Sequence, residues 1–206
     1  MKAISVKQAY SKVFKKFDFT DLWLKAFGTP ETTGFWYLGG GEKNGKTTFA
    51  MMLAKYLTSF GKVLYISAEE GISDAVINAM MFAGLSDTER NFHIIDYEPW
   101  EDLQNRFNSR KCAKIIFLDN STVYRDEITR KMVSELKQNH PDKLFIMVCH
   151  EEKGLPDNAL AKLWRKLAKI IIQAEGLKAL ISGRCPGGEL NINEQKAQLY
   201  WGTKEN

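Results

Sequence analysis

A glycine-rich segment near residue 40 has the residue types and spacing with the clearest chemical meaning. Gly40 to Thr47 fits the pattern G-x-x-x-x-G-K-[ST], between an apolar run that ends at Leu38 and a helical pattern that begins near Phe49. In this context, glycines let successive main-chain N–H groups point inward, and the helix N-terminus adds its positive dipole end. We therefore expect the chain to bind a nucleoside triphosphate at this loop, which has the Walker A pattern.

The individual residues of the loop have distinct expected roles. Lys46 would reach the β- and γ-phosphates, and the Thr47 hydroxyl would hold Mg²⁺, so we expect ATP and Mg²⁺ as ligands. The alternative is an incidental glycine-rich turn. In that case the apolar run before it and the helical pattern after it would be there by coincidence. The residues expected to contact nucleotide are Gly40, Gly41, Glu42, Lys43, Asn44, Gly45, Lys46, Thr47 and Thr48.

Three further residues that could do chemistry each follow an apolar run: Glu69, Asp119 and His150. Ligands of open α/β sheets bind at the carboxyl ends of the strands. Asp119 has the position of a Walker B carboxylate, which binds Mg²⁺ directly or through water. The alternative is an ordinary acidic residue at a strand end.

Glu69 is the residue that we expect to polarise the attacking water, because phosphoryl transfer depends on positioning more than on covalent help. Glu70 competes for this role, since the loop could turn either carboxylate inward, and a third interpretation leaves both as solvated acids. His150 could sense the γ-phosphate or could be a structural residue at a strand end.

A basic stripe accompanies an apolar one over residues 158–170. The apolar residues recur at helical spacing, and the basic residues repeat this spacing two positions later, on the opposite side of a helix. The stripe is either a solvated face or a contact surface for a nucleic-acid backbone, which Lys153 could extend. Its members are Lys162, Arg165, Lys166 and Lys169.

The elements that must position these residues read as an α/β domain. Near-continuous apolar strands alternate with helices, which implies a mostly parallel sheet covered on both faces. After Gly176 the pattern changes, and the segments 178–184, 190–192 and 198–201 predict antiparallel β-structure. Residues 33–206 would form this domain.

Residues 1–32 would form an N-terminal helical arm. Val6, Tyr10, Val13 and Phe17 have the spacing of an amphipathic helix over residues 4–17. The arm could pack on its own domain or on a neighbouring subunit.

Length and composition fit this organisation. The 206 residues suit one domain, with 44% hydrophobic residues and a net charge of +4 that permits a polyanionic partner. No apolar run approaches the length needed to cross a membrane, and the scattered cysteines (Cys112, Cys149 and Cys185) fit reduced thiols. We expect a cytoplasmic protein that lacks a membrane contact.

Three segments resemble motifs of the RecA-like ATPases, in particular the RadA/Sms and DnaB-type branch. Residues 63–70 are similar to its second-strand motif, and residues 149–154 to its sensor strand and the start of its DNA-facing loop. Residues 181–189 resemble a hairpin that reaches the nucleotide site of the adjacent subunit. Arg184 matches the arginine of that hairpin, whereas its lysine is Ser182 here.

The resemblance covers about residues 33–202 and extends to compact single-domain RecA-like proteins of bacterial prophages and integrative elements. It implies a core in which the phosphate-loop strand is central and the His150 strand lies between it and the Asp119 strand. It also implies that Glu69 is the catalytic carboxylate and that Arg184 acts on a neighbouring subunit in a ring or filament.

The function that we expect is a Mg²⁺-dependent ATPase that forms homo-oligomers and acts on single- or double-stranded DNA, in replication, recombination or maintenance of a mobile element. A second hypothesis is an ATP-dependent switch or loader that recruits a protein partner. A third is a small-molecule kinase, against which the absence of an arginine-rich lid segment argues.

Overall fold

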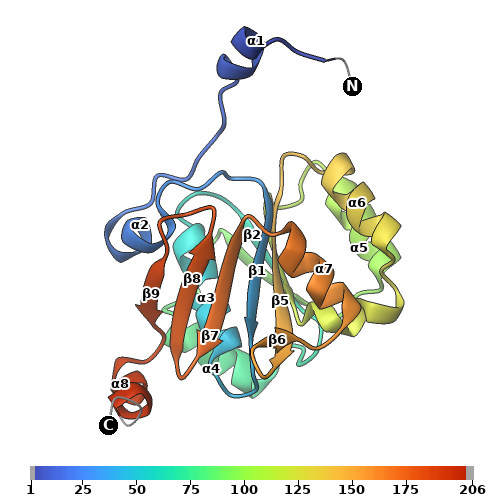
Figure 1. Ribbon diagram of the computed structural model, residues 1–206. Helices are drawn as coiled ribbons and strands as arrows, with labels where there is room; N and C mark the ends of the chain where they lie inside the picture. Colours follow the sequence, from blue (N-terminus) through green and yellow to red (C-terminus); the bar gives the residue numbers. More distant parts are fainter. Residues whose placement is uncertain (1–2, 203–206) are drawn as a thin grey trace.

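A computed structural model describes residues 3–202, which form one mainly parallel sheet with helices packed on both of its faces (Figure 1). The strands are β1 (Gly34–Gly40), β2 (Val63–Ser67), β3 (Phe92–Asp96), β4 (Ile115–Asp119), β5 (Leu144–Glu152), β6 (Leu155–Pro156), β7 (Ile170–Glu175), β8 (Lys178–Gly183) and β9 (Gly188–Asn191). The helices are α1 (Val6–Tyr10), α2 (Asp21–Phe27), α3 (Lys46–Leu57), α4 (Asp74–Phe82), α5 (Trp100–Asn108), the 3₁₀-helix η1 (Ser121–Asp126), α6 (Arg130–Asn139), α7 (Ala159–Leu167) and α8 (Glu194–Gly202).

The strand order is β3-β2-β4-β5-β1-β7-β8-β9, with β6 paired to β5 outside this path. Strands β1 to β5 and β7 run parallel, and β8 and β9 continue the sheet in antiparallel orientation. The predicted order is confirmed, because β1 is central and β5 separates it from β4. The parallel strands therefore all end at one edge of the sheet, where a ligand of an open α/β sheet binds.

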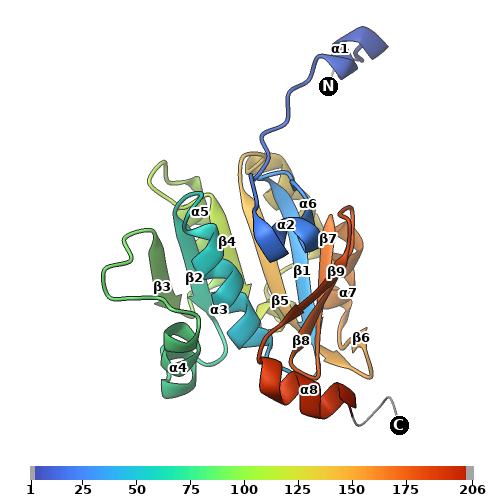
Figure 2. The ribbon, with the colours of Figure 1, turned by 90° about the vertical axis from the view of Figure 1, so that its left-hand side faces the viewer.

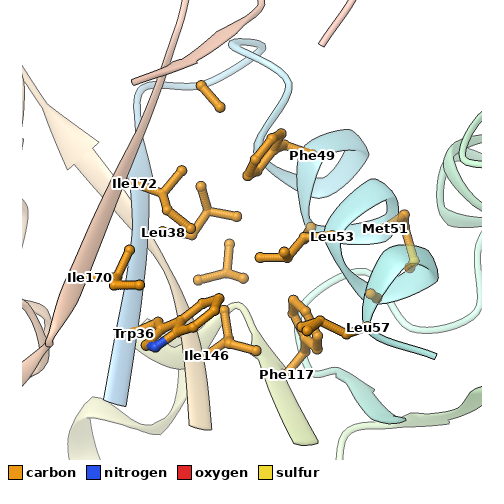
Figure 3. Close-up of a cluster of buried hydrophobic side chains, with 14 of the residues drawn as sticks. Trp36, Leu38, Phe49, Met51, Leu53, Leu57, Phe117, Ile146, Ile170 and Ile172 are labelled. Atoms are coloured by element: carbon orange, nitrogen blue, oxygen red, sulfur yellow. The ribbon is translucent and has the colours of Figure 1, made fainter. Parts of the chain in front are cut away.

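Two apolar layers hold the helices on the sheet. On one face, Leu38 of β1 and Ile146 of β5 lie against Phe49 and Leu53 of α3 (Figure 3). On the other face, α5, α6 and α7 cover side chains such as Phe35 and Phe145. Burial of nearly every residue of β1, β2, β4 and β5 explains their continuous apolar sequences.

The N-terminal segment differs from its prediction as a helix over residues 4–17. The helix α1 has only five residues and a Ser5–Gln8 capping box, and it stands away from the body of the molecule in both views (Figures 1 and 2). Phe17 lies in the core beside Phe19, two residues further along, which is the periodicity of extended chain and not of a helix. A β-bridge between Lys16 and Glu31 holds this extended segment.

Phe19 attaches the end of the arm to the domain. Its ring is 1% exposed and contacts the rings of Phe27, Trp36 and Tyr56. Residues 17–32 are thus packed on the domain core, whereas Tyr10 is 87% exposed. Residues 1–2 and 203–206 of the two predicted segments lie outside the described part of the chain.

Two predictions for the C-terminal region are wrong. Residues 198–201 belong to the helix α8 and not to a strand, since they continue a run of good helix formers that begins at Glu194. The helix predicted over residues 158–170 ends at Leu167, and Ile170 begins the strand β7. Lys169 therefore lies outside the helix that was predicted to carry it.

Candidate nucleotide-binding site

The glycine-rich loop connects β1 to α3 at the carboxyl edge of the sheet. Gly40 has a φ of +155°, and a Cβ at this position would lie 2.4 Å from the Ala174 carbonyl oxygen of β7. Gly45, the residue before α3, has a φ of +87°. Both positions require glycine, so the sequence pattern has a direct conformational cause.

Lys46 folds back across the loop, and its Nζ donates to the Gly41 carbonyl oxygen at 2.8 Å. Burial lowers the pKa of this lysine, and the carboxylates of Asp119 and Glu69 offset part of the effect. A phosphate group in the loop would offer the ammonium group a charged partner in place of a neutral carbonyl.

The turn between β7 and β8 supports the loop from the side. The Gly176 N–H donates to the Asn44 side chain at 2.8 Å, and the same side chain donates to the Glu42 carbonyl oxygen at 3.2 Å. Leu177 of this turn would touch a Cβ placed on Gly45. The loop conformation is thereby fixed by the fold around it.

Asp119 ends β4 beside the loop, with 9% of its surface exposed. The Tyr65 hydroxyl donates to its Oδ2 at 2.5 Å. Burial, together with the nearby carboxylates of Glu70 and Glu69, raises the pKa of Asp119 to about 6, against the opposing effects of Tyr65 and Lys46. A cation at this position would favour the charged carboxylate.

Glu69 lies in the turn that follows β2, two residues after Ser67, and has two side-chain partners. Its Oε2 is 3.2 Å from Nε2 of His150 and accepts a hydrogen bond from the Asn120 amide at 3.1 Å. Glu70 lines the same cavity. These contacts orient the Glu69 carboxylate, while its side chain remains 49% exposed and accessible to water.

The loop and the strand-end residues surround one cavity of about 570 Å³, within the usual range for small-molecule sites. Its lining includes Lys46, Thr47, Glu69, Asp119 and His150. An adjoining hollow of about 270 Å³ lies between α4 and the C-terminal segment and shares Thr48 and Leu177 with the first. Together the two spaces have room for phosphates and for a nucleoside.

The residues of the cavity fit Mg²⁺. Thr47 and Asp119 offer hydroxyl and carboxylate oxygens, the hard donors that this ion prefers. Residues 3–202 contain no group of three or more His, Cys, Asp or Glu side chains arranged to hold a metal. Proteins usually bind Mg²⁺ through one or two side chains together with phosphates and water.

Comparison with solved structures identifies the fold. The flagellar accessory protein FlaH from Methanocaldococcus jannaschii matches with a TM-score of 0.62 and 18% identity, over 87% of this chain and 92% of that chain. The KaiC-like protein PH0186 from Pyrococcus horikoshii OT3 matches with a TM-score of 0.59 and 15% identity, over 82% and 88%. The chain has a RecA-like fold. No protein-family model matches the sequence, and a comparison with curated proteins gives no significant match.

In this RecA-like fold, Arg184 is remote from the cavity of its own chain. It follows β8, whose last residue Gly183 pairs with Ile170 at the start of β7, whereas the phosphate loop lies near Ala174 at the end of β7. The Arg184 side chain is exposed at the opposite edge of the sheet. Any contact with a nucleotide would have to involve another subunit.

The residues of the predicted basic surface separate into two groups. Lys153, Lys162 and Lys166 are exposed. Arg165 donates to Glu151 and to the Gly154 carbonyl oxygen, each at 3.2 Å. Lys169 pairs with Glu31 at 2.7 Å, so both of these cations have partners within the chain.

Sequence reasoning missed three residues that line the cavity or contact its lining. Asn120 directly follows Asp119, and its position after a strand-end acid was the available signal. Tyr65 has a polar hydroxyl within an otherwise apolar strand that ends beside β4. Leu177 has no signal of its own, because its place beside the loop depends on the strand β7, which the sequence did not reveal.

Within the described residues, none of the helices has the length and apolar character needed to span a membrane.

Proposed function

We propose that the chain is a Mg²⁺-dependent RecA-like ATPase that assembles into oligomers and acts on nucleic acid. The observation that carries the proposal is that the glycine loop, Asp119 and the Glu69–His150 pair line a single cavity. A phosphate-binding loop needs only the first of these, whereas hydrolysis needs a metal-side carboxylate and a residue that positions water.

Each residue has a definite task in this mechanism. The N–H groups of the loop and Lys46 would hold the phosphates, and Thr47 and Asp119 would hold Mg²⁺, which neutralises charge on the phosphates when bound. Glu69 would accept a hydrogen bond from the attacking water and align it with the terminal phosphate. Asn120 and His150 would keep the Glu69 carboxylate in place, and His150 could respond to the γ-phosphate through the same contact.

Phosphate release from Mg²⁺-ATP, without any added acceptor, tests the reaction. Lys46→Ala should lower turnover by about 10²-fold or more, the usual effect of removing one charged donor from an electrostatic site. Lys62→Ala is the matched control, because Lys62 is exposed and lies outside the cavity. Equal turnover of the Lys46→Ala variant and the parent would refute the proposed site. A requirement for an acceptor would instead indicate a kinase.

The nucleic-acid part rests on the exposed lysines at positions 153, 162 and 166. A single strand held by three such contacts should lose affinity with salt at a slope of about −2 in log K against log[salt]. Lys153→Ala should weaken binding and flatten this slope by about 0.7. Absence of binding at low salt would remove the nucleic-acid part and leave the ATPase untouched.

A second candidate function is a nucleotide switch that engages a protein, and the exposed arm favours it. Tyr10, Val13 and Phe14 are 87%, 96% and 57% exposed, although large apolar side chains are usually covered. Sedimentation of the chain alone, with and without a non-hydrolysable ATP analogue, tests whether the arm mediates self-association.

A change in sedimentation would indicate self-association. The switch would be favoured if sedimentation did not change and the chain formed an ATP-dependent complex with another protein that survives nuclease treatment.

A further inference from the structure

A buried carboxylate lies on the face of the sheet opposite to the cavity. Successive strand residues point to opposite faces, so His150 faces the cavity and Glu151 faces α7, where it bonds Arg165. The Glu151 side chain is 1% exposed. Its Oε1 accepts from the Tyr37 hydroxyl at 3.0 Å and from Arg165 at 3.2 Å, while its buried Oε2 has no hydrogen-bond partner among the described residues.

The burial of this carboxylate is weak evidence for a role in stability. Taking a carboxylate out of water costs several kcal/mol, and pairing it with a guanidinium group often returns no net gain over an apolar side chain of similar size. An unpaired buried oxygen adds to the cost and is uncommon in native proteins. The apolar cluster on this face, which includes Tyr37, Cys149 and Trp164, shows that the face accepts nonpolar groups.

The contacts of Glu151 connect two functional segments. On one side, its carboxylate packs on the main chain just before the phosphate loop, since a Cβ on Gly39 would lie 2.5 Å from Oε1. On the other side, Arg165 bonds both Oε1 and the Gly154 carbonyl oxygen in the turn between β5 and β6. A path of direct contacts therefore runs from Gly39 through Glu151 and Arg165 to Gly154.

We propose that Glu151 is a positioning residue that couples the phosphate loop to the β5–β6 hairpin, so that nucleotide in the cavity changes the hairpin beside Lys153. The inference rests on the proposed function, because it requires a nucleotide at the loop. Phosphates would draw Lys46 from the Gly41 carbonyl oxygen, which alters the main chain two residues from Gly39. A movement of the main chain at Gly39 would reach Arg165, because the Glu151 carboxylate contacts Gly39 on one side and the Arg165 guanidinium group on the other.

Hydrogen–deuterium exchange of the full chain tests the coupling. In the parent, a non-hydrolysable ATP analogue with Mg²⁺ should change exchange in residues 152–158 by about fivefold or more, the lower end of typical coupling between sites. Glu151→Gln should keep analogue affinity within about twofold and lose the hairpin response, because the amide keeps the shape of the side chain without its charge. A residue that only stabilised the fold would change unfolding and leave this response intact.

Matched controls distinguish the charge at this position from charge nearby. Glu152→Gln makes the same change at the adjacent exposed residue, and Lys166→Met removes an exposed cation beside Arg165, so both should keep the parent response. The double variant Glu151→Gln/Arg165→Gln leaves no unpaired charge and should fold even if the single variant does not. It should also lose the response.

The outcomes separate this inference from the proposed function. A full hairpin response in Glu151→Gln or in the double variant overturns the coupling. So does a parent that binds the analogue with no change in the hairpin, and in that case the ATPase proposal stands. A parent that does not bind nucleotide overturns both.

Discussion

Replacing Asp119 by asparagine should stabilise the nucleotide-free protein while removing most of the stabilisation that Mg²⁺ and nucleotide provide. Burial raises the pKa of Asp119 from an ordinary 3.8 to about 6 in the folded chain. A raised pKa in an acid means that ionisation opposes folding, and a difference of about two pH units corresponds to about 3 kcal/mol. The penalty is absent below pH 4, grows as the pH rises, and is complete above about pH 6.

Urea unfolding of the parent and of Asp119→Asn in the presence of a chelator measures this penalty. The asparagine can still accept the Tyr65 hydrogen bond, so the charge is the main difference between the two chains. The variant should be more stable by about 3 kcal/mol at pH 7.5 and by about 1 kcal/mol at pH 4.5. Asp126→Asn is the control, because that side chain is 89% exposed and should show no such gain.

Mg²⁺-nucleotide should stabilise the parent more than it stabilises the Asp119→Asn variant. At a concentration of Mg²⁺-nucleotide a hundred times its dissociation constant, the parent should gain about 2.7 kcal/mol, and the variant much less at that concentration. Equal stability of the two chains at pH 7.5 without metal would refute the argument from burial. An equal gain with Mg²⁺-nucleotide would refute Asp119 as the metal-side carboxylate.

Further substitutions test other parts of the site and fold. Glu69→Gln should retain ATP and lower phosphate release by about 10²-fold, whereas normal release in this variant together with loss in Glu70→Gln would move the water-positioning role to Glu70. Gly40→Ala should destabilise the chain by about 1–3 kcal/mol in urea unfolding, from its φ and from a clash with a neighbouring carbonyl. Phe19→Ala should cost about 3–5 kcal/mol in the same assay, and Phe14→Ala less than about 0.5, because only the first ring is buried.

The fold was predictable wherever one local signal decided the structure. The glycine loop needs residues without a Cβ, and the apolar strands need burial on both faces, so both features are visible in the sequence. The strand β7 was missed because Ile170 follows a strongly amphipathic helix without a Gly or Pro between them. Its alternating burial reflects a position between the parallel and antiparallel parts of the sheet, which is a tertiary property.

The N-terminal prediction failed for a related reason. Spacing alone cannot distinguish a helix that covers a core from a short helix followed by extended chain. Phe17 fits the helical spacing from Val13, but it also precedes Phe19 by two residues, and the aromatic layer around Trp36 selects the second pattern. Tertiary contact with the core overrides the local period here.

The site shows a similar division between local and tertiary information. That strand-end acids and bases would meet at one edge followed from the sheet class, and the cavity brings Glu69, Asp119 and His150 together. The partners of each residue depend on strand order and side-chain direction. The basic stripe demonstrates this, because its spacing predicted one surface, while Arg165 bonds internal partners and Lys169 lies beyond the helix.

The two buried carboxylates at this edge of the sheet allow a test of whether a buried acidic side chain serves the stability of the fold or its function. Asp119 and Glu151 lie near the phosphate loop in layers where apolar side chains would fold at least as well. If these charges served the fold, their amide variants would be less stable in proportion to their loss of activity. Since ionised Asp119 opposes folding, we expect the reverse at that position, with stability raised while nucleotide binding is lost. At Glu151 the Glu151→Gln/Arg165→Gln variant makes the comparison, because it leaves neither charge unpaired, and we expect it to stay folded while the coupling is lost.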